Sequence, residues 1–596
     1  MAGSTIIEAS AINGQTYSSS GQSIEIIKNS GTDYIDSLFS DYYEGPRKWN
    51  TDPYLDSKYS KDGSIVISYS FASDTALYSP DWFAMQDHSV VYDPTAYKET
   101  QKVDIRTAFT EFSQFINISF VEVSENNNKV GSIRFFINSL ISSTEGVIGD
   151  AVGDQPDKNP QAGDIIFSPK YADLSFGQGL VEGAGTYSPF AVLTHEIQHA
   201  LGIEHPGDHR TISFPEEKIF TKYTVMTGIE GDAQPYRKDG IEYGVVQASM
   251  VYDIAALQYL YGANMSHNSG NNTYFYKPDT PFIETIWDAG GTDTLDFSNF
   301  SKASTISLIG GEYSTIGFDV DWSMSNNLGI AFNATIENAS GGAGSDNITG
   351  NPSGNILKGN AGDDTIRGKE GNDQLHGDGG NDFLYGDGGN DTIFADGGSD
   401  SIDGGGGIDT IKYTLSQANY ILALGETNST IKEISTNTND SFSTIERIVF
   451  ADNAIALDID GANSAGGIYR TYKAAFNRTP DKGGFGYWID RADNGASAVQ
   501  MAEGFVWSGE FQTLYGVTTS DNYLVGNDVE AVVDLFYRNV LGRAPDQGGL
   551  DYYASTIVAQ DKTGGQVLAE IADSAENRTN LLSTLENGMN YDLWVA

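Results

Sequence analysis

Three histidines and one glutamate lie close together in the segment His195-Glu196-Ile197-Gln198-His199-Ala200-Leu201-Gly202-Ile203-Glu204-His205. Residues four apart share one face of an α-helix, so His195 and His199 can hold one ion while Glu196 lies beside it. A zinc ion held by imidazoles polarises a carbonyl and lowers the pKa of its water to about 7. The pattern therefore predicts peptide-bond hydrolysis at zinc, with Glu196 as the general base that takes the water proton.

A third ligand depends on how the predicted helix ends. Gly202 can adopt a positive φ angle, which ends the helix and lets the chain turn back, so that His205 becomes the third ligand. Ser188 is a suitable N-cap residue and Pro189 a suitable first helical residue. An accidental surface pattern is the alternative for the short motif, but Gly202 and His205 in register disfavour it. A buried stripe repeats at helical spacing at Phe190, Leu193, Ile197 and Leu201.

The composition narrows the partners and excludes several kinds of site. The chain has 81 acidic and 34 basic residues and a net charge of −47. This charge disfavours nucleic acids and anionic membranes as binding partners and favours divalent cations. The absence of cysteine excludes disulfides, a thiolate zinc site, a cysteine nucleophile and a cysteine switch. Residues 1–8 lack the pattern of a cleaved signal peptide, and no apolar run is long enough for a membrane span, so we expect a soluble chain.

A nine-residue repeat begins near residue 346. Each unit combines one Asp with an apolar residue two positions later and a Gly two positions earlier, which is typical of a parallel β-roll. The second unit departs from the pattern with Ser353 and Asn355, and we expect a weaker calcium site there or none. The repeated acidic or amide position is occupied by Asp346, Asn355, Asp364, Asp373, Asp382, Asp391, Asp400 and Asp409, and the apolar position by Ile348, Leu357, Ile366, Leu375, Leu384, Ile393, Ile402 and Ile411.

The repeat predicts calcium sites between stacked turns. Carbonyl and carboxylate oxygens are the hard ligands that Ca²⁺ prefers, and each unit offers both in its glycine-rich half-turn. One apolar residue per unit makes a thin core, so without the ion the carboxylates repel and the segment stays largely unfolded. A low-complexity Gly/Asp linker is the alternative, and the strict phase over eight units argues against it.

The zinc segment resembles that of the metzincin peptidases, and Tyr223–Thr227 is similar to their methionine turn, with Met226 as a base-plate beneath the zinc. The continuation 205–208 and the runs 252–264 and 287–298 resemble the serralysin subgroup, over about residues 33–411. The resemblance implies an α/β catalytic domain at 31–265, preceded by a propeptide at 1–30, and a calcium-binding roll with flanking strands at 266–460. It adds the calcium ligands Asp288, Asp293 and Asp296 at the start of the roll.

One position departs from the serralysin pattern. Gly228 stands where serralysins carry a tyrosine that reaches the zinc or the oxyanion, and Tyr236 or Tyr243 is the nearby substitute. Loss of such a donor costs on the order of 10²-fold in rate. This departure keeps open a second function class, a noncatalytic calcium-dependent surface-layer or adhesion protein on a degenerate peptidase domain.

Local periodicity predicts the elements around the zinc helix. Residues 101–116 have a helical apolar stripe, and 118–123, 133–137 and 164–167 have strand patterns. A mixed sheet packed against the zinc helix fits the α/β domain. Beyond the repeats, residues 412–460 alternate apolar and polar positions, as expected of strands that cap the roll.

The last part of the chain contains a duplication. We expect a linker at 461–467 and an all-α domain at 468–590, in which 478–485 and 543–550 are copies offset by 65 residues. Each copy predicts two helices around a Pro-Asp-x-Gly-Gly turn. Its Asp481 and Asp546 are either turn residues or extra calcium ligands. The domain resembles a helical domain of unknown function appended to secreted RTX proteins, which implies either surface-layer attachment or a stabilising, secretion-assisting tail.

The RTX resemblance also implies the route and the place of action. Such proteins leave bacteria unfolded through a type I exporter and fold outside in millimolar calcium, and residues 591–596 resemble the acidic-then-apolar end of their secretion signals. The leading hypothesis is thus a secreted endopeptidase with one catalytic Zn²⁺ and several structural Ca²⁺, acting on protein or peptide substrates. No nucleic-acid partner is expected.

Overall fold

The computed structural model describes most of the chain from residue 249 onward and selected elements before it. Contacts divide the chain into two compact units, Met1–Thr349 and Gly350–Ala596, and each is described by itself. The described residues are 5–6, 11–12, 15–16, 23–26, 47–51, 65–72, 97–125, 131–137, 149–152, 163–167, 181–182, 189–206, 224–226, 236–238, 241–244, 249–320, 325–425, 428–516, 518–520, 523–525 and 529–594.

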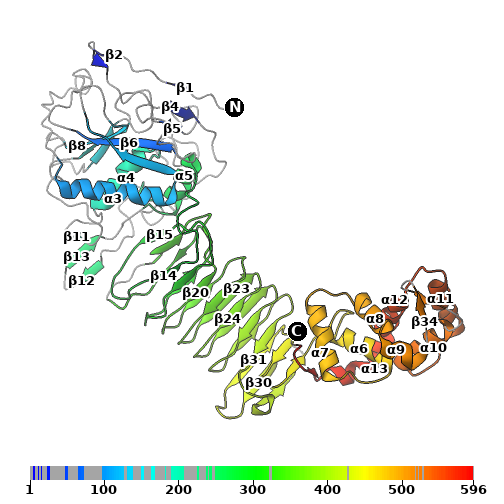
Figure 1. Ribbon diagram of the computed structural model, residues 1–596. Coiled ribbons are helices and arrows are strands. Elements are labelled where there is room, and N and C mark those ends of the chain that lie inside the picture. The colour runs from blue at the N-terminus through cyan, green and yellow to red at the C-terminus, as the bar shows by residue number, and fades with distance from the viewer. Residues whose placement is uncertain are drawn as a thin grey trace. The chain divides into compact units, whose positions relative to one another are not determined.

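A five-stranded mixed sheet forms the centre of the N-terminal part, in the order β7-β6-β8-β10-β9. Four strands are parallel neighbours, and β9 pairs antiparallel with β10 at the edge. The helix predicted at 101–116 and the strands predicted at 118–123, 133–137 and 164–167 are confirmed within two residues (Figure 1). The strands are β6 (Ile65–Phe71), β7 (Ile118–Glu122), β8 (Ile133–Ile137), β9 (Gly149–Val152) and β10 (Asp164–Phe167).

The N-terminal part also contains three helices: α3 (Glu99–Phe115), α4 (Pro189–Ala200) and α5 (Val251–Tyr261). The apolar stripe of α3 is buried at Ile105, Ala108, Phe109, Phe112 and Phe115, and the helix contacts β7 and α4. Helix α4 contacts β9 and β10. The stripe predicted for α4 is likewise buried at Phe190, Leu193, Ile197 and Leu201, whereas Ser188 lies outside the described residues. The zinc segment therefore stands on a helix fixed to the sheet.

Short strands complete the N-terminal part. They are β1 (Thr5–Ile6), β2 (Ala11–Ile12), β3 (Gln15–Thr16), β4 (Ser23–Ile26), β5 (Arg47–Thr51), β11 (Val181–Glu182), β12 (Tyr236–Lys238) and β13 (Ile241–Gly244). Strand β4 lies inside the predicted propeptide and pairs with β5, which follows the expected boundary at residue 30. Most of residues 1–30 lie outside the described residues.

The first unit also contains the start of the roll. Short strands pair in parallel as β14-β16-β20, β17-β21 and β15-β19. They are β14 (Thr273–Phe275), β15 (Glu284–Ile286), β16 (Thr294–Asp296), β17 (Thr305–Ser307), β18 (Tyr313–Ser314), β19 (Leu328–Ile330), β20 (Asn338–Ser340) and β21 (Asn347–Thr349).

The repeats of the second unit form the predicted parallel β-roll. Strands eighteen residues apart pair in register, as Leu375 with Ile393 and Leu384 with Ile402, so successive nine-residue units alternate between two sheets. Every apolar residue of the row from Leu357 to Ile411 is buried. One sheet contains β22 (Ile356–Lys358), β24 (Gln374–His376), β26 (Thr392–Phe394) and β28 (Thr410–Lys412), and the other contains β23 (Thr365–Glu370), β25 (Phe383–Gly388) and β27 (Ser401–Asp403).

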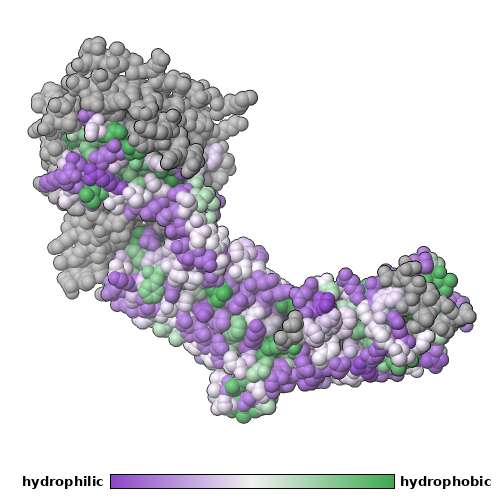
Figure 2. All heavy atoms as spheres, in the orientation of Figure 1, coloured by the Kyte–Doolittle hydropathy of each residue, from purple (hydrophilic) through white to green (hydrophobic). Residues whose placement is uncertain are grey.

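Strands cap the far end of the roll, as the alternating pattern at 412–460 predicts. They are β29 (Tyr420–Ala423), β30 (Ser429–Glu433), β31 (Asn439–Ser443), β32 (Arg447–Val449) and β33 (Ala454–Ala456), after a 3₁₀ turn at Gln417–Asn419. Hydrophilic residues predominate over the roll on the face drawn in Figure 2. This surface is consistent with a core that is confined to one apolar residue per unit.

Eight helices in two similar sets of four follow the roll among the described residues. They are α6 (Ala465–Phe476), α7 (Lys482–Asp493), α8 (Ala498–Val506), α9 (Gly509–Tyr515), α10 (Val529–Leu541), α11 (Gln547–Val558), α12 (Gly564–Ala572) and α13 (Ala575–Leu585), with a hairpin of β34 (Thr518–Ser520) and β35 (Tyr523–Val525) between the sets. Asp481 and Asp546 each cap the second helix of a set, accepting N–H bonds of 2.7 Å from Gly484 and Gly549. The glycine pair therefore belongs to the first helical turn.

The linker expected at 461–467 is shorter than predicted. Helix α6 already begins at Ala465, because Ser464 caps it by accepting from the N–H of Gly467 at 3.0 Å. Added Cβ atoms at Gly466 and Gly467 would come within 2.3 Å of backbone oxygens. The glycines therefore serve close packing at the helix start.

The chain returns to the roll after the last helix. Strand β36 (Met589–Tyr591) pairs antiparallel with β33, and the N–H of Asp592 donates to the Lys482 carbonyl at 3.2 Å. The predicted signal at 591–596 thus begins inside a strand of the sheet, and its last two residues lie outside the described ones. Among the described residues we find no helix with the length and apolarity that a membrane crossing requires.

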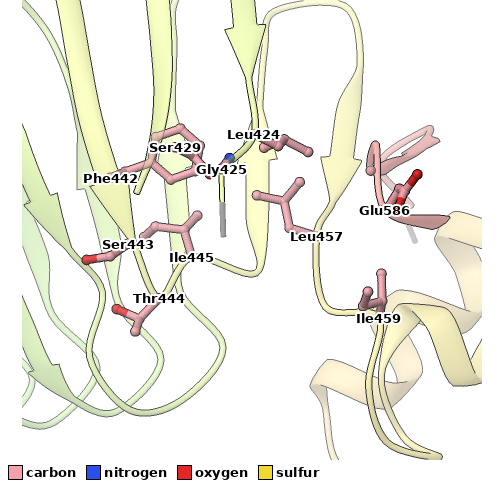
Figure 3. Close-up of a pocket in the computed structure, with 11 residues that line it drawn as sticks. Leu424, Gly425, Ser429, Phe442, Ser443, Thr444, Ile445, Leu457, Ile459 and Glu586 are labelled. Carbon is pink, nitrogen blue, oxygen red and sulfur yellow. Dashed lines mark hydrogen bonds between the residues drawn. The ribbon is translucent and has the colours of Figure 1, made fainter. Parts of the chain in front are cut away.

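A pocket of about 220 Å³ lies where the capping strands meet the helical domain (Figure 3). Its walls include Phe442, Ile445, Leu457 and Ile459, and the end of α13 contributes Glu586. The roll and the helical domain therefore meet around a shared pocket as well as through the pairing of β33 with β36.

Candidate metal centre

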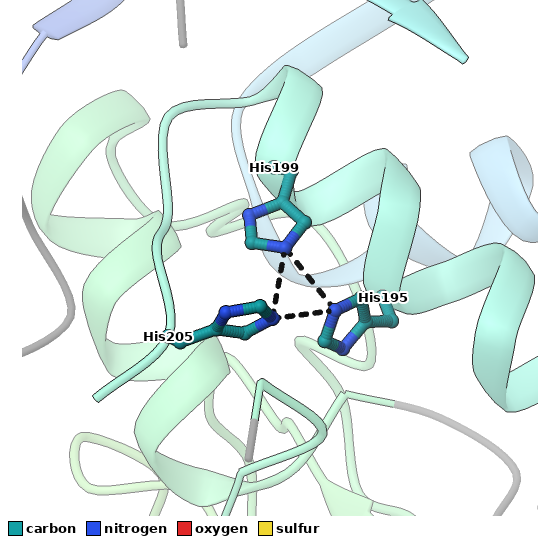
Figure 4. A group of neighbouring side chains, drawn as sticks. All are labelled: His195, His199 and His205. Carbon is teal, nitrogen blue, oxygen red and sulfur yellow. Dashed lines mark hydrogen bonds between the residues drawn. The ribbon is translucent and has the colours of Figure 1, made fainter. Parts of the chain in front are cut away.

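The three predicted zinc ligands converge on one point. The Nε2 atom of His195 lies 3.1 Å from Nε2 of His199 and 3.1 Å from Nε2 of His205, and the remaining pair is 3.2 Å apart (Figure 4). The three histidines, which lie up to ten positions apart in the sequence, thus bring one imidazole nitrogen each into the same small volume.

The end of α4 brings His205 to the other two histidines. Gly202 has φ +106°, and the N–H of Ile203 donates back to the Gln198 carbonyl at 3.0 Å. A side chain disfavours this left-handed conformation, so glycine permits the turn that reverses the chain. Gly202 thus has the positive φ angle that the sequence predicts at this position.

Backbone carbonyls determine which ring nitrogens of two histidines carry a proton. Nδ1 of His195 lies 2.7 Å from the Val225 carbonyl, and Nδ1 of His199 lies 2.8 Å from the Ile203 carbonyl. Because a carbonyl only accepts, each Nδ1 is the donor and each Nε2 of the neutral ring carries a lone pair. The short Nε2 contact between His195 and His199 is therefore one between two acceptors, which a cation stabilises.

Burial favours the neutral form of these imidazoles. Desolvation lowers the pKa of His195 to about 4 and holds the pKa of His199 well below its usual range. Both rings are consequently neutral at pH 7. This is the protonation state that binds a metal ion.

The distances fit zinc. Zn–N bonds of about 2.0–2.1 Å in a tetrahedral arrangement separate the nitrogens by about 3.3 Å, close to the 3.1–3.2 Å observed. Glu196 follows His195 on α4 and is only 6 % exposed, so the predicted base is a buried residue of the same helix. The site thus has three converging nitrogens on and directly after a helix that also carries a buried carboxylate.

A turn at residues 224–226 supports the first ligand. Val225 supplies the carbonyl that orients His195, and Met226 is fully buried, as expected of a base-plate residue. Asp253 of α5 holds this turn, since its carboxylate accepts from the Thr224 hydroxyl, from the Val225 N–H at 2.9 Å and from the Met250 N–H at 2.8 Å.

Sequence reasoning missed Asp253. The carboxylate is completely buried, and desolvation raises its pKa to about 6 although its hydrogen bonds oppose the rise. Its signal was a single charged residue in the run Val251–Tyr261, which is otherwise almost wholly apolar or aromatic. We assign Asp253 to positioning of the turn.

The position of the substitute tyrosine stays a prediction. Gly228 lies outside the described residues, and Tyr236 and Tyr243 are opposite one another as backbone partners in the β12–β13 hairpin. Only their backbone is described. The two tyrosines therefore occupy paired positions on the two strands of the hairpin.

The repeat aspartates share one geometry. Oδ1 of Asp373 accepts the N–H of Asn355 at 2.7 Å, and Oδ1 of Asp391 accepts that of Asp373 at 2.8 Å, each from eighteen residues earlier. The second oxygen, Oδ2, is buried and has no hydrogen-bond donor among the described residues. This holds for Asp373, Asp382, Asp391 and Asp409.

Glycine provides the space around these oxygens. A Cβ atom at Gly368 would lie 2.2 Å from Oδ2 of Asp373, and one at Gly386 would lie 2.3 Å from Oδ2 of Asp391. Burial raises the pKa of Asp373, Asp400 and Asp409 to about 7. A buried carboxylate oxygen without a donor needs a cation or a proton, so this row fits hard-oxygen calcium coordination.

The other predicted calcium ligands differ in their hydrogen bonding. Asp293 resembles the row, with a buried Oδ2 that has no donor among the described residues. Asp346 uses both oxygens for the N–H groups of Ser304 and Gly342. Asp288 accepts hydrogen bonds from Tyr274 and Gly290, and Asp296 accepts one from Ser298. Asp346, Asp288 and Asp296 therefore all accept hydrogen bonds from the protein itself. In the second unit, Asn355 bonds within its own turn to Asn351.

Two known families match the part of the chain that contains the histidine site and the part that contains the aspartate row. Residues 88–226 match the matrixin family and residues 252–423 match the Peptidase M10 serralysin C terminal family. Residues 462–515 and 518–581 each match a domain of unknown function, DUF4214, which confirms the predicted duplication.

Three curated relatives are similar to this chain. Serralysin of Proteus mirabilis is 30% identical over 312 residues, which are 48% of this chain and 60% of that protein. Serralysin B of Dickeya chrysanthemi is 32% identical over 42% of this chain and 54% of its own length. Metalloprotease AprA of Pseudomonas entomophila (strain L48) is 30% identical over 48% of this chain and 59% of its own length. The matched part thus spans at most about three fifths of these relatives.

Proposed function

We propose that this chain, whose residues 88–226 and 252–423 match the matrixin and serralysin C-terminal families, is a secreted zinc-dependent endopeptidase of serralysin type that calcium folds and stabilises. The observation that carries the proposal is the convergence of three Nε2 atoms at 3.1–3.2 Å. Two of these rings also have their Nδ1 atoms oriented by carbonyls. Such an arrangement is a preorganised site for one zinc ion.

The residues divide the chemistry among them. Zinc bound by His195, His199 and His205 would supply Lewis acidity toward the scissile carbonyl and an acidified water. Glu196 removes the water proton and transfers it to the departing amine nitrogen, so peptide hydrolysis balances without a covalent enzyme intermediate. Asp253 and the 224–226 turn hold His195 in its binding orientation.

Calcium is the proposed folding cofactor of the roll. The buried oxygens of Asp373, Asp382, Asp391 and Asp409 support this assignment, because an ion there neutralises charges that the thin core otherwise could not tolerate. Extracellular calcium would then fold the roll after type I export. The substrates of the peptidase would be extracellular or surface proteins.

A noncatalytic calcium-dependent surface-layer or adhesion protein is the second candidate. Gly228 in place of the usual tyrosine and the duplicated helical domain favour it. The buried Glu196 beside the three histidines favours the enzyme, since adhesion requires no general base at that position.

Casein cleavage in millimolar calcium distinguishes the two candidates. We expect activity that a zinc chelator removes, and a loss of at least 10²-fold in Glu196→Gln, because the water proton then has no acceptor. Glu99→Gln, which removes an exposed carboxylate of α3, is the control and should match the wild type. Equal cleavage by Glu196→Gln and wild type would rule out the α4 site as the source of the activity, and no chelator-sensitive cleavage by either would rule out the enzyme.

A further inference from the structure

We propose that the roll holds a divalent transition-metal ion at His376, Asp378 and Asp396, a site apart from both the α4 histidines and the buried aspartate row. One ligand atom from each of these residues lies within 4.8 Å of the others. Nδ1 of His376 is 3.9 Å from Oδ2 of Asp396.

The repeat itself places these groups together. Strands β24 and β26 pair in parallel with His376 opposite Phe394, so Asp378 and Asp396 occupy the same place in turns eighteen residues apart. The N–H of Gly397, next to Asp396, donates to the carbonyl of Asp378 at 2.7 Å, which fixes the two turns on one another. The two carboxylates therefore stack beside one imidazole.

The imidazole is held in place. Its ring stacks on Phe394 with centroids 4.0 Å apart and planes inclined by 6°, and its side chain is 19% exposed. A ring fixed in this way loses little freedom when it binds an ion, which favours affinity. Asp396, with 34% of its side chain exposed, can rotate to complete the coordination.

The equivalent position of the next repeat unit is paired with a protein cation. Asp387, nine residues after Asp378, pairs with Arg367 at 2.6 Å, and that guanidinium lies over the Tyr385 ring at 4.3 Å. No lysine or arginine among the described residues forms an ion pair with Asp378 or Asp396. Asp378 and Asp396 have the imidazole of His376 beside them, and the nearby cation Lys358, opposite His376 in strand β22, forms an ion pair with neither carboxylate among the described residues.

The donor set selects the kind of ion. One imidazole nitrogen and two carboxylates suit borderline ions such as Zn²⁺, Co²⁺ or Ni²⁺, whereas Ca²⁺ takes six to eight oxygens. Closing the 3.9 Å separation to about 3.3 Å would bring nitrogen and oxygen to the spacing of a shared zinc ion. The turn aspartates Asp382 and Asp400 stay with the calcium row, because they are buried in the interior of the roll.

Calorimetric titration of Zn²⁺ into the full chain tests this site, with the α4 site already loaded and millimolar calcium present. We expect one additional equivalent in the wild type and in Asp387→Asn, and binding at least tenfold weaker in His376→Gln and in Asp378→Asn. An X-ray absorption spectrum of the added metal should show one imidazole. Unchanged titration in His376→Gln, or no additional equivalent in the wild type, would overturn the proposal.

Circular dichroism in calcium separates loss of the site from loss of the fold. His376→Gln should fold at the same calcium concentration as the wild type and keep its casein cleavage. A failure of this proposal thus leaves the peptidase proposal standing, and the reverse also holds.

Discussion

The N–H of Asp391 donates to Oδ1 of Asp409 at 2.9 Å, while Oδ2 of each of these two aspartates is buried without a donor among the described residues. One oxygen of each carboxylate thus links successive turns of the roll, and the other is available to a cation. This relationship repeats every nine residues. Calcium at these oxygens, as proposed, would couple ion binding to the stacking of the turns.

Replacing one member of the row should shift calcium-dependent folding. Asp391→Asn keeps an acceptor for the N–H of Asp373 but removes the charge that calcium requires, so the calcium concentration for half-folding should rise severalfold. Asp363→Asn removes an exposed charge from the same roll and should leave the midpoint nearly unchanged. Circular dichroism during calcium titration measures both, and equal midpoints for the two variants would contradict the assignment.

Acid should partly replace calcium. Burial raises the pKa of Asp373, Asp400 and Asp409 to about 7 from an ordinary value of 3.8, so the folded roll binds protons that the unfolded chain releases. Stability from this protonation is fully present below pH 3.8, falls as pH rises and is lost above about 7. In a chelator, the roll should gain strand content between pH 7.5 and pH 5.

Calcium should show the opposite pH dependence. Protons compete with the ion for the same oxygens, so the calcium midpoint should increase as pH falls from 7.5 to 5. A roll that loses strand content on acidification in chelator, or a midpoint independent of pH, would be inconsistent with carboxylates as the shared ligands.

Asp253 should affect zinc binding from a distance. Asp253→Ala leaves the N–H groups of Val225 and Met250 buried without their acceptor, at a cost of about 1–3 kcal/mol each in unfolding free energy. Because Val225 orients His195, zinc affinity should fall about 10–100-fold. Competition with a zinc-binding dye measures it, and Asp253→Asn should retain part of the affinity. Unchanged affinity in Asp253→Ala would remove its positioning role.

The last strand should depend on Gly486 of α7. A Cβ atom there would lie 1.9 Å from the Asp592 carbonyl, whereas one at Gly483 meets nothing closer than an Asp481 oxygen at 3.9 Å. Each Gly→Ala change gains similar helix propensity, about 1 kcal/mol, so their difference isolates the contact with the C-terminal segment. Hydrogen exchange of residues 589–592 should accelerate in Gly486→Ala only; equal exchange in both variants would argue against this contact.

Local sequence was sufficient for the elements that carry the chemistry. The 3.6-residue stripe predicted α4, the histidine spacing placed two ligands on one face, and Gly202 predicted the reversal that delivers His205. The nine-residue period predicted the roll and its buried row, because a strict repeat forces every unit into the same local conformation. These features depend on neighbours only a few residues away.

Tertiary structure decided what depends on distant partners. Asp253 acquires its role only where α5 meets the 224–226 turn, and the return of β36 to β33 joins residues 133 or more positions apart in sequence. It also separated Asp373 and its equivalents, each with one oxygen lacking a donor, from Asp346, whose oxygens both accept backbone N–H bonds. Sequence determined which residues could bind metal; packing decided which carboxylates keep a buried oxygen without a donor among the described residues, since hydrogen-bond partners are assigned only when the chain folds.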